Sequence, residues 1–272
     1  MNDFVSTAPV TGLSVVIPTL NRIDMVLHAI ESVSSTHPEC VEIIVIDDGS
    51  AEDLRTQLPA RNSSDVVVRG YRFQSNRGPQ AARNLGIRRA RFSHIAFLDS
   101  DDEFTPEKID TVLHELQKQE IDVLFHAVGG MPQYTMLARA WNRYLRLLVP
   151  FTWLCTLYNP VVTPALVVRR CCCLGLPTMR YCEDWFFLLR YVDADMVVVY
   201  LDRELSTVRR APGTSGGLSG AIWKMRKGEF KARLVLLRHL TICNIARYLV
   251  GSLAGLARIA SDTMRGRYRR SS

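Results

Sequence analysis

The sequence lacks both the cysteine spacing of a zinc site and the features of a secretion signal. Its seven cysteines contain no Cys-x-x-Cys pair with a second such pair at a zinc-like distance. The adjacent Cys171, Cys172 and Cys173 are too close to bridge one another usefully, so we expect reduced thiols, some of them buried. Residues 1–9 carry an acid and a proline where a signal peptide needs a basic start and a long apolar core, which predicts a cytoplasmic protein.

Internal repeats, low-complexity stretches and nucleic-acid recognition motifs are also missing. The 272 residues, 47% of them hydrophobic, suffice for one sizeable α/β domain with a small appendage. The net positive charge comes from the end of the chain, because residues 221–272 carry a net +10 and the first 220 residues a net −3. Without a recognition motif, this charge does not indicate a nucleic-acid partner.

Three β-branched apolar runs each end in polar turn residues. They are Leu13 to Arg22, Val41 to Ser50, and His94 to Asp102. Residues at helical spacing lie between them, so the order is strand, helix, strand, helix, strand, which predicts a mainly parallel sheet. In such sheets the ligand site lies outside the carboxyl ends of the strands. Four acidic residues would then share that edge: Asp47, Asp48, Asp99 and Asp101.

The third run is the most informative, because Leu98-Asp-Ser-Asp-Asp102 places three acids within four residues. Only the small Ser100 separates Asp99 from Asp101, so both carboxylates can turn toward one hard divalent cation. Phosphate or water oxygens would complete its coordination. The alternative is a solvated acidic turn in which Ser100 or Asp101 caps a helix that opens near Thr105.

Five motifs in order carry a resemblance to a known family. They are Val15-Val-Ile-Pro-Thr-Leu-Asn-Arg22, Ile46-Asp-Asp-Gly-Ser50, Asn76-Arg-Gly-Pro-Gln-Ala-Ala-Arg-Asn84, Leu98-Asp-Ser-Asp-Asp102 and Glu183-Asp-Trp185. Over roughly residues 13–212 the chain resembles family-2 glycosyltransferases of the GT-A fold. The resemblance implies a Rossmann-like, mixed but mainly parallel sheet with flanking helices. It also implies inverting transfer of a sugar from a nucleotide-diphospho-sugar, a UDP-sugar being favoured, with Mn²⁺ or Mg²⁺ bridging the diphosphate to the Asp-x-Asp motif.

The resemblance assigns the donor side to residues at the predicted sheet edge. Asp47 and Asp48 can accept charge-assisted hydrogen bonds from the base and ribose, and Asp48 matches the family's usual nucleotide contact. Pro18 and Thr19 would form the opposite wall through backbone groups. Arg83 opens a helix after a Gly-Pro turn and can balance diphosphate charge. The alternative is that Asp48 and its neighbours form only a turn with a helix cap.

The acceptor side is assigned to the acidic pair Glu183 and Asp184 at a predicted helix start. Asp184 matches the family's general base, which takes the acceptor proton as the acceptor oxygen attacks. Trp185 would stack under a sugar or pack in the core. Alternatively, both acids merely complement a helix dipole. The family often has threonine before this pair where this chain has Cys182, which leaves the base intact.

A later segment, Val208 to Ser219, resembles the flexible loop that closes over donor phosphates in this family. Arg209 or Arg210 would add positive charge there, and the prediction favours Arg210 as a donor-binding residue. The alternative is a simple linker into the C-terminal segment.

The remaining segments concern the acceptor and the membrane. Met131 to Pro164 is rich in aromatic residues and leucine, and we expect it to shape a site for a glycan or a polyprenyl-linked glycan. Ala232 to Ala260 is apolar and helix-prone, but arginines leave no uninterrupted 18-residue apolar run, which disfavours a membrane-spanning helix. We expect an amphipathic helix on an anionic membrane. The alternative is a pair of helices packed on the catalytic domain.

These patterns divide the chain into an N-terminal extension (1–12), a GT-A catalytic domain (13–215) and a basic amphipathic helical tail (216–272). The predicted function is glycosyl transfer in bacterial surface-polysaccharide biosynthesis, on the inner face of the cell membrane. A nucleotidyltransferase would need a Gly-rich basic signature after the first strand, which Pro18 to Arg22 is not. A catalytically inactive sugar-binding or scaffold protein is disfavoured by four intact acids: Asp48, Asp99, Asp101 and Asp184.

Overall fold

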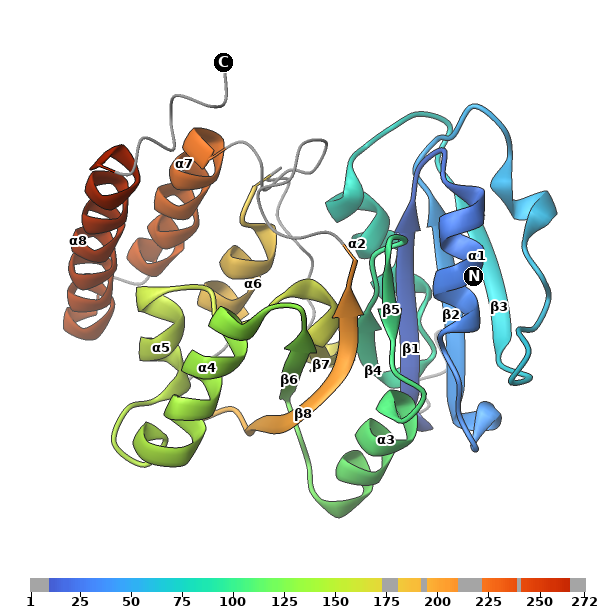
Figure 1. Cartoon of the computed structure of the whole chain (residues 1–272), viewed down its shortest axis with the longest axis horizontal. Coiled ribbons are helices and arrows are strands. Elements are labelled where there is room, and N and C mark those ends of the chain that lie inside the picture. Colours follow the sequence, from blue (N-terminus) through green and yellow to red (C-terminus); the bar gives the residue numbers. More distant parts are fainter. Residues whose placement is uncertain (1–9, 173–180, 192–194, 210–221, 239–240, 265–272) are drawn as a thin grey trace, which may run out of the picture.

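The computed structural model describes residues 10–172, 181–191, 195–209, 222–238 and 241–264. A mixed sheet of eight strands forms its centre, in the order β3-β2-β1-β4-β7-β6-β8-β5 (Figure 1). The strands are β1 (Val10–Thr19), β2 (Val41–Asp47), β3 (Val67–Arg72), β4 (Phe92–Phe97), β5 (Asp102–Phe104), β6 (Val123–Gly129), β7 (Val167–Arg169) and β8 (Val198–Val208). The helices are α1 (Ile23–Glu31), α2 (Pro79–Arg89), α3 (Lys108–Lys118), α4 (Pro132–Ala140), α5 (Phe151–Leu157), α6 (Glu183–Tyr191), α7 (Ile222–Arg233) and α8 (Ile242–Met264).

The first four strands in this order, β3, β2, β1 and β4, are parallel. In the central strands β1 and β2 the β-branched and aliphatic side chains are buried on both faces, which is why these two runs are almost continuously apolar. The other half of the sheet is mixed, because β7 is antiparallel to β4 and β6, while β8 is parallel to β6 and antiparallel to β5. The predicted mixed, mainly parallel sheet with flanking helices is confirmed.

Each face of the sheet carries its own apolar core. On one face α1 and α3 pack against alternate residues of β1, β2 and β4, such as Val15 and Ile43. On the other face α2, α5 and α6 pack against residues such as Val16 and Ile44. Because both faces are covered, the edge formed by the carboxyl ends of the parallel strands, at the top of Figure 1, is left to present polar groups.

Strand β5 is one element that the sequence pattern did not indicate. It is only three residues long, two of them acidic, and it forms because Asp102 and Phe104 pair with the end of β8. The helix expected to open near Thr105 begins at Lys108, after this strand.

The aromatic segment after β6 forms α4, a π-helical turn (Trp141–Leu145) and α5. The indole N–H of Trp141 donates to the Val149 carbonyl at 2.7 Å, and the Phe151 ring lies 5.0 Å from that of Phe125 and 5.2 Å from that of Trp141. Much of the aromatic content therefore joins this segment to the sheet. Its part in an acceptor site stays a prediction.

The basic tail packs on the rest of the protein, at the left of Figure 1. Arg247 of α8 donates to the Thr152 carbonyl and to the Thr156 hydroxyl, both at 2.9 Å, and so joins α8 to α5. These contacts show α8 packed on the domain, as the alternative interpretation of the tail expects, whereas contact of the tail with a membrane stays a prediction. By length and composition alone, α8 is also long and apolar enough to cross a membrane, which the sequence argument had disfavoured.

Candidate active site

The end of β2 supplies two buried carboxylates with different partners. Asp47 accepts from the backbone N–H of Ser50 at 2.9 Å and from its hydroxyl at 2.5 Å, and lies 3.6 Å from Arg72. Asp48 accepts from the backbone N–H groups of Arg77 and Gly78, each at 2.8 Å. Burial raises the pKa of Asp48, although these two backbone hydrogen bonds act against the rise. Asp48 therefore holds the loop before α2 against the sheet edge.

The end of β1 lies beside it. The backbone N–H of Asp48 donates to the carbonyl of Thr19 at 2.8 Å, so the ends of the two strands are joined. Pro18 and Thr19 are buried, and the Thr19 hydroxyl is a buried polar atom with no hydrogen-bond partner among the described residues. The structure thus brings Pro18, Thr19, Asp47 and Asp48 to the one edge where the sequence placed them.

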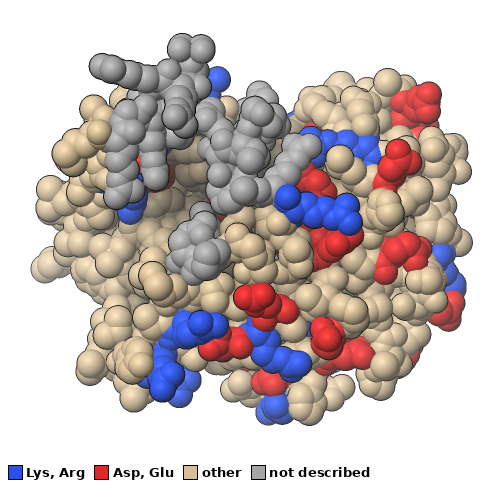
Figure 2. Space-filling model, viewed as in Figure 1, with Lys and Arg blue, Asp and Glu red and all other residues tan. Residues whose placement is uncertain are grey.

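The acids after β4 meet two arginines from other elements. Asp99 accepts from the guanidinium of Arg83 at 2.5 Å, and Arg83 is itself almost fully buried at the start of α2. Asp101 accepts from Arg22, which follows β1, at 3.1 Å. Arg83 and Arg22 thus both contact these carboxylates, and the motifs assigned no role to Arg22. The role of Arg83 toward a diphosphate stays a prediction. Figure 2 shows acidic and basic side chains meeting in the upper middle of the view.

Asp102, the third acid of this motif, is turned inward. Burial, followed by the charges of Asp99 and Asp101, raises its pKa to about 8. It accepts from the backbone N–H of Arg209 at 3.3 Å, while the Arg209 guanidinium contacts Glu103. Arg210, the favoured donor-loop residue, lies outside the described residues.

Asp184 lies near the arginine–carboxylate pair, at the start of α6. It accepts from the side-chain amide of Asn159 and from the backbone N–H of Trp185, each at 2.8 Å. Burial raises the pKa of Asp184, these two hydrogen bonds and the positive charge of Arg83 lower it, and the negative charge of Asp99 raises it. The charges of Arg83 and Asp99 thus act on the candidate base. A raised pKa suits a group that must accept a proton.

The neighbours of Asp184 differ from expectation in one respect. Trp185 is only 3% exposed, donates through its indole N–H to the Cys155 carbonyl at 2.6 Å, and has the Arg233 guanidinium 4.5 Å from its ring. Of the two roles open to Trp185, core packing is the one that this geometry favours over stacking under a sugar. Glu183 begins α6, and its side chain is not among those described.

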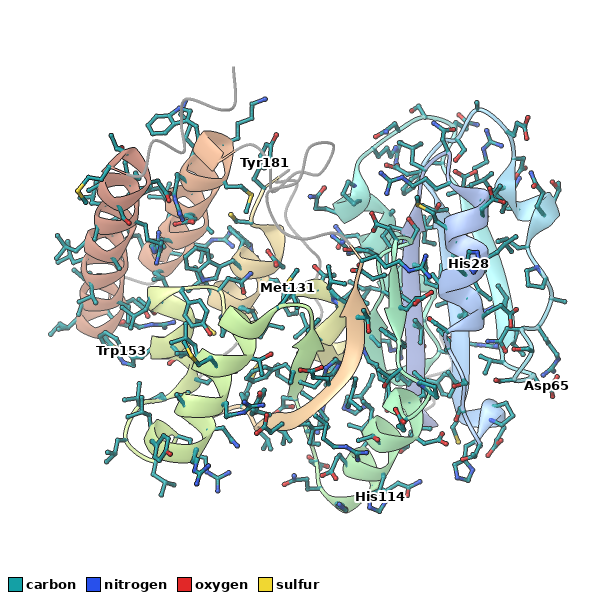
Figure 3. The ribbon with its side chains drawn as sticks, in the orientation of Figure 1. His28, Asp65, His114, Met131, Trp153 and Tyr181 are labelled. Atoms are coloured by element: carbon teal, nitrogen blue, oxygen red, sulfur yellow. The ribbon has the colours of Figure 1, made fainter. Side chains whose placement is uncertain are left out.

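Cys182 introduces this helix with a positive φ of 59°, unusual for a residue other than glycine. Its neighbour Tyr181, labelled in Figure 3, lies against α7, because a Cβ built on Gly228 would be 3.0 Å from the Tyr181 Cβ. Contacts with the tail therefore fix the start of α6.

The carboxylates fit a metal that arrives with a substrate. Among the described side chains, no group of three or more His, Cys, Asp and Glu converges into a metal site. Asp99 and Asp101 supply carboxylate oxygens, and each is already in contact with an arginine. Two carboxylates joined by substrate phosphates and water form the ligand set that Mg²⁺ typically takes, and Mn²⁺ also favours oxygen ligands.

Two residues that sequence reasoning missed stand out. Arg22 ends the first motif and carried a signal, namely a cation just beyond a strand end. Asn159 carried none, because it lies within the aromatic segment and meets Asp184 only through the fold.

The chain is similar to a known family and to proteins of known sequence and structure. The family model described as Glycosyl transferase family 2 matches residues 14–169. An uncharacterized glycosyltransferase of Rickettsia felis is 44% identical over 108 residues, covering 40% of this chain and 18% of that protein. Succinoglycan biosynthesis protein ExoU of Rhizobium meliloti is 34% identical over 110 residues, covering 40% of this chain and 32% of that protein. The chain thus spans well under half of the length of these two relatives.

Two solved structures share the fold at low sequence identity. TarS of S. aureus in complex with UDP has a TM-score of 0.64 at 17% identity, over 87% of this chain and 68% of that chain. A mannosyltransferase from Pyrobaculum calidifontis in complex with GDP-Man and Mn²⁺ has a TM-score of 0.64 at 11% identity, over 95% of this chain and 82% of that chain.

Proposed function

The chain belongs to glycosyl transferase family 2 and is a transferase of the GT-A fold, and on this premise we propose that it moves a sugar from a nucleotide-diphospho-sugar to a glycan or lipid-linked glycan, with inversion at the anomeric carbon. A UDP-sugar is the proposed donor. One observation carries the proposal: the candidate base Asp184 lies within electrostatic reach of the Arg83–Asp99 pair at the carboxyl edge of the sheet. The groups that would balance the charge of the donor diphosphate and the group that would accept the proton of the acceptor hydroxyl are therefore neighbours.

On the donor side, Asp48 receives the base and ribose beside the Thr19 carbonyl, which faces it across the ends of two strands. Arg83 and Arg22 exchange their carboxylate partners for diphosphate oxygens as the donor enters. Arg210 supplies further charge from the segment after β8.

On the acceptor side, Asp184 accepts the proton of the attacking hydroxyl while the carbon–diphosphate bond breaks on the opposite face of the sugar. Burial and the negative charge of Asp99 raise the pKa of Asp184. The Asn159 amide orients the carboxylate. Glu183 lies beside it on the acceptor side in this proposal.

The proposed cofactor is Mn²⁺ or Mg²⁺, held by Asp99 and Asp101 together with the donor diphosphate. When bound, such a cation stabilises the negative charge that develops on the leaving diphosphate. A solved structure of similar fold contains Mn²⁺ together with GDP-Man, which supports this choice.

We place the reaction in bacterial surface-polysaccharide assembly, at the cytoplasmic face of the membrane. The relative named for succinoglycan biosynthesis supports the pathway class. In this proposal residues 13–215 form the catalytic domain, and the tail from residue 216 holds it at the membrane through a peripheral contact.

The first experiment is a thermal-shift series with UDP, GDP and their sugar conjugates, each with and without Mn²⁺, because a ligand that binds only the folded state raises the melting temperature. A manganese-dependent rise with uridine nucleotides is expected. A rise with guanosine nucleotides alone would replace the proposed donor, and no rise with any nucleotide would favour the scaffold alternative.

Two variants separate the proposed roles. Asp101→Ala should abolish the manganese-dependent rise, whereas Asp184→Asn should keep it and stop sugar transfer. Asp24→Ala, which removes an exposed carboxylate of α1, is the matched control and should change neither quantity. Equal loss of donor binding in Asp101→Ala and Asp184→Asn would contradict the division of roles.

A further inference from the structure

The loop between α4 and α5 exposes leucines that a folded domain normally buries. Leu147 is 91% exposed and Leu148 is 80% exposed, and Tyr144 and Leu145 beside them are also exposed. We call Tyr144–Val149 the leucine loop. It lies at the lower left of Figure 1, away from the sheet edge that carries the candidate active site.

Helix α8 has two different faces. One face packs on the protein and buries Arg247, Gly251, Gly255 and Asp262. The opposite face exposes apolar side chains at intervals of three or four residues: Ile242, Ile245, Leu249, Leu253 and Leu256. Because the inward face carries a buried arginine and a buried carboxylate, α8 is suited to lie along an apolar boundary rather than to leave the protein and span a bilayer.

The leucine loop and the start of α8 lie at the same end of the molecule. Helices α5 and α8 run in the same direction, because Arg247 contacts Thr152 at the start of α5 and Arg258 contacts Leu157 at its end. Leu148 precedes α5 and Ile242 begins α8, so both project from the shared starting end of this helix pair.

The exposed charged side chains of the segments that form this surface are all basic. The sequence contains no Asp or Glu between Asp122 and Glu183, or between Glu229 and Asp262. Arg143 and Arg146 are exposed within or beside the leucine loop, and Arg238 is exposed shortly before α8. In Figure 2 the lower left of the molecule is mostly uncharged and carries basic side chains, with acidic ones beside them toward the middle.

We propose that the leucine loop and the outer face of α8 form one docking surface for an anionic lipid bilayer. The leucines enter the acyl region while the arginines contact the headgroups. The proposal rests on the peripheral membrane contact proposed above for the tail, and adds a second element from the middle of the chain that fixes how the domain sits on the membrane. A second copy of this chain fits less well, because a two-fold contact would bring two acid-free, basic surfaces together.

The test is co-flotation of the whole 272-residue chain with vesicles of 30% phosphatidylglycerol and 70% phosphatidylcholine, and with vesicles of phosphatidylcholine alone. Leu147→Glu and Leu253→Glu change the two elements separately. Met25→Glu, an exposed apolar residue of α1, is the matched control. Since all three side chains are exposed, the variants should keep the wild-type melting temperature.

We expect binding to the anionic vesicles that weakens at least tenfold, equivalent to about 1.4 kcal/mol, in Leu147→Glu and in Leu253→Glu, and is unchanged in Met25→Glu. Full binding by Leu147→Glu would show that the leucine loop is not part of the docking surface. No binding by the wild type would overturn the proposal. A dimer in lipid-free solution that both variants dissociate would identify a second copy as the occupant instead. Donor binding is measured separately by thermal shift. A failure to bind vesicles would therefore not contradict the proposed sugar transfer, and a failure to bind nucleotides would not contradict the docking surface.

Discussion

Removing the side-chain amide of Asn159 should shift the pH dependence of the reaction. Asn159 donates to the carboxylate of Asp184 at 2.8 Å, and this hydrogen bond lowers the pKa of a carboxyl that burial raises. A hydrogen bond to a charged group contributes about 1.5–3 kcal/mol. Asn159→Ala should therefore raise the pKa of Asp184 further, because the charged carboxylate loses this stabilisation.

The sign of the effect follows from the role of Asp184. A base must be deprotonated to act, so the rate falls as the pH drops through its pKa. In Asn159→Ala this fall should begin at a higher pH than in the wild type, with little loss on the alkaline plateau. The measurement is kcat/KM for release of the nucleotide diphosphate from the donor, taken across the pH range in the presence of Mn²⁺.

Two further variants separate this effect from a structural one. Asn159 also accepts from the backbone N–H of Val161 at 3.3 Å, a contact that Asn159→Asp can keep while its negative charge raises the pKa of Asp184 further. Asn142→Ala changes the same residue type in the same segment and should leave the profile unmoved. A uniform loss of rate at every pH in Asn159→Ala and Asn159→Asp would refute the reasoning.

Three other outcomes are expected. Gly86→Ala should lower the free energy of unfolding by about 1–3 kcal/mol in urea titrations, because its Cβ would lie 2.3 Å from a buried valine of β1, whereas Gly129→Ala, whose nearest neighbour is at 3.5 Å, should cost less. Glu229→Ala should cost about 3 kcal/mol and expose the tail to limited proteolysis, because this buried carboxylate pairs with arginines of both tail helices. In the native protein an aromatic disulfide reagent should modify the exposed Cys243 and spare Cys155, since burial raises the pKa of the Cys155 thiol; rapid reaction of Cys155 would contradict the packing described.

The donor edge could be predicted from the sequence because its signals are local. Asp48 and Asp99 lie one and two residues beyond the ends of buried strands, and parallel strands bring their carboxyl ends to one edge whatever the details of packing. The fold of the first half of the chain followed from the same alternation of strand and helix patterns. Nothing beyond residue order was needed for these inferences.

Features created by long-range contacts could not be read in this way. Asn159 meets Asp184 across the fold, and β5 exists only because it pairs with β8. An aromatic residue at a helix start, such as Trp185, fits a sugar platform and a core equally well by pattern. Nor does spacing reveal that Arg233 and Arg247, apparent surface charges of the tail, turn inward.

The packing of Trp185 against arginines of the tail limits where the chain can be truncated without damage to the catalytic helix. Its ring lies 4.5 Å from the Arg233 guanidinium and 5.7 Å from that of Arg258, and the next residue back along the chain is Asp184. Truncation before α7, intended to abolish lipid binding, would also expose this indole. It would remove the arginines that pack against Trp185, the residue next to the candidate base. Loss of activity in such a truncated enzyme would then report damage to the catalytic helix, so point substitutions on the outer surface are the sounder way to separate anchoring from catalysis.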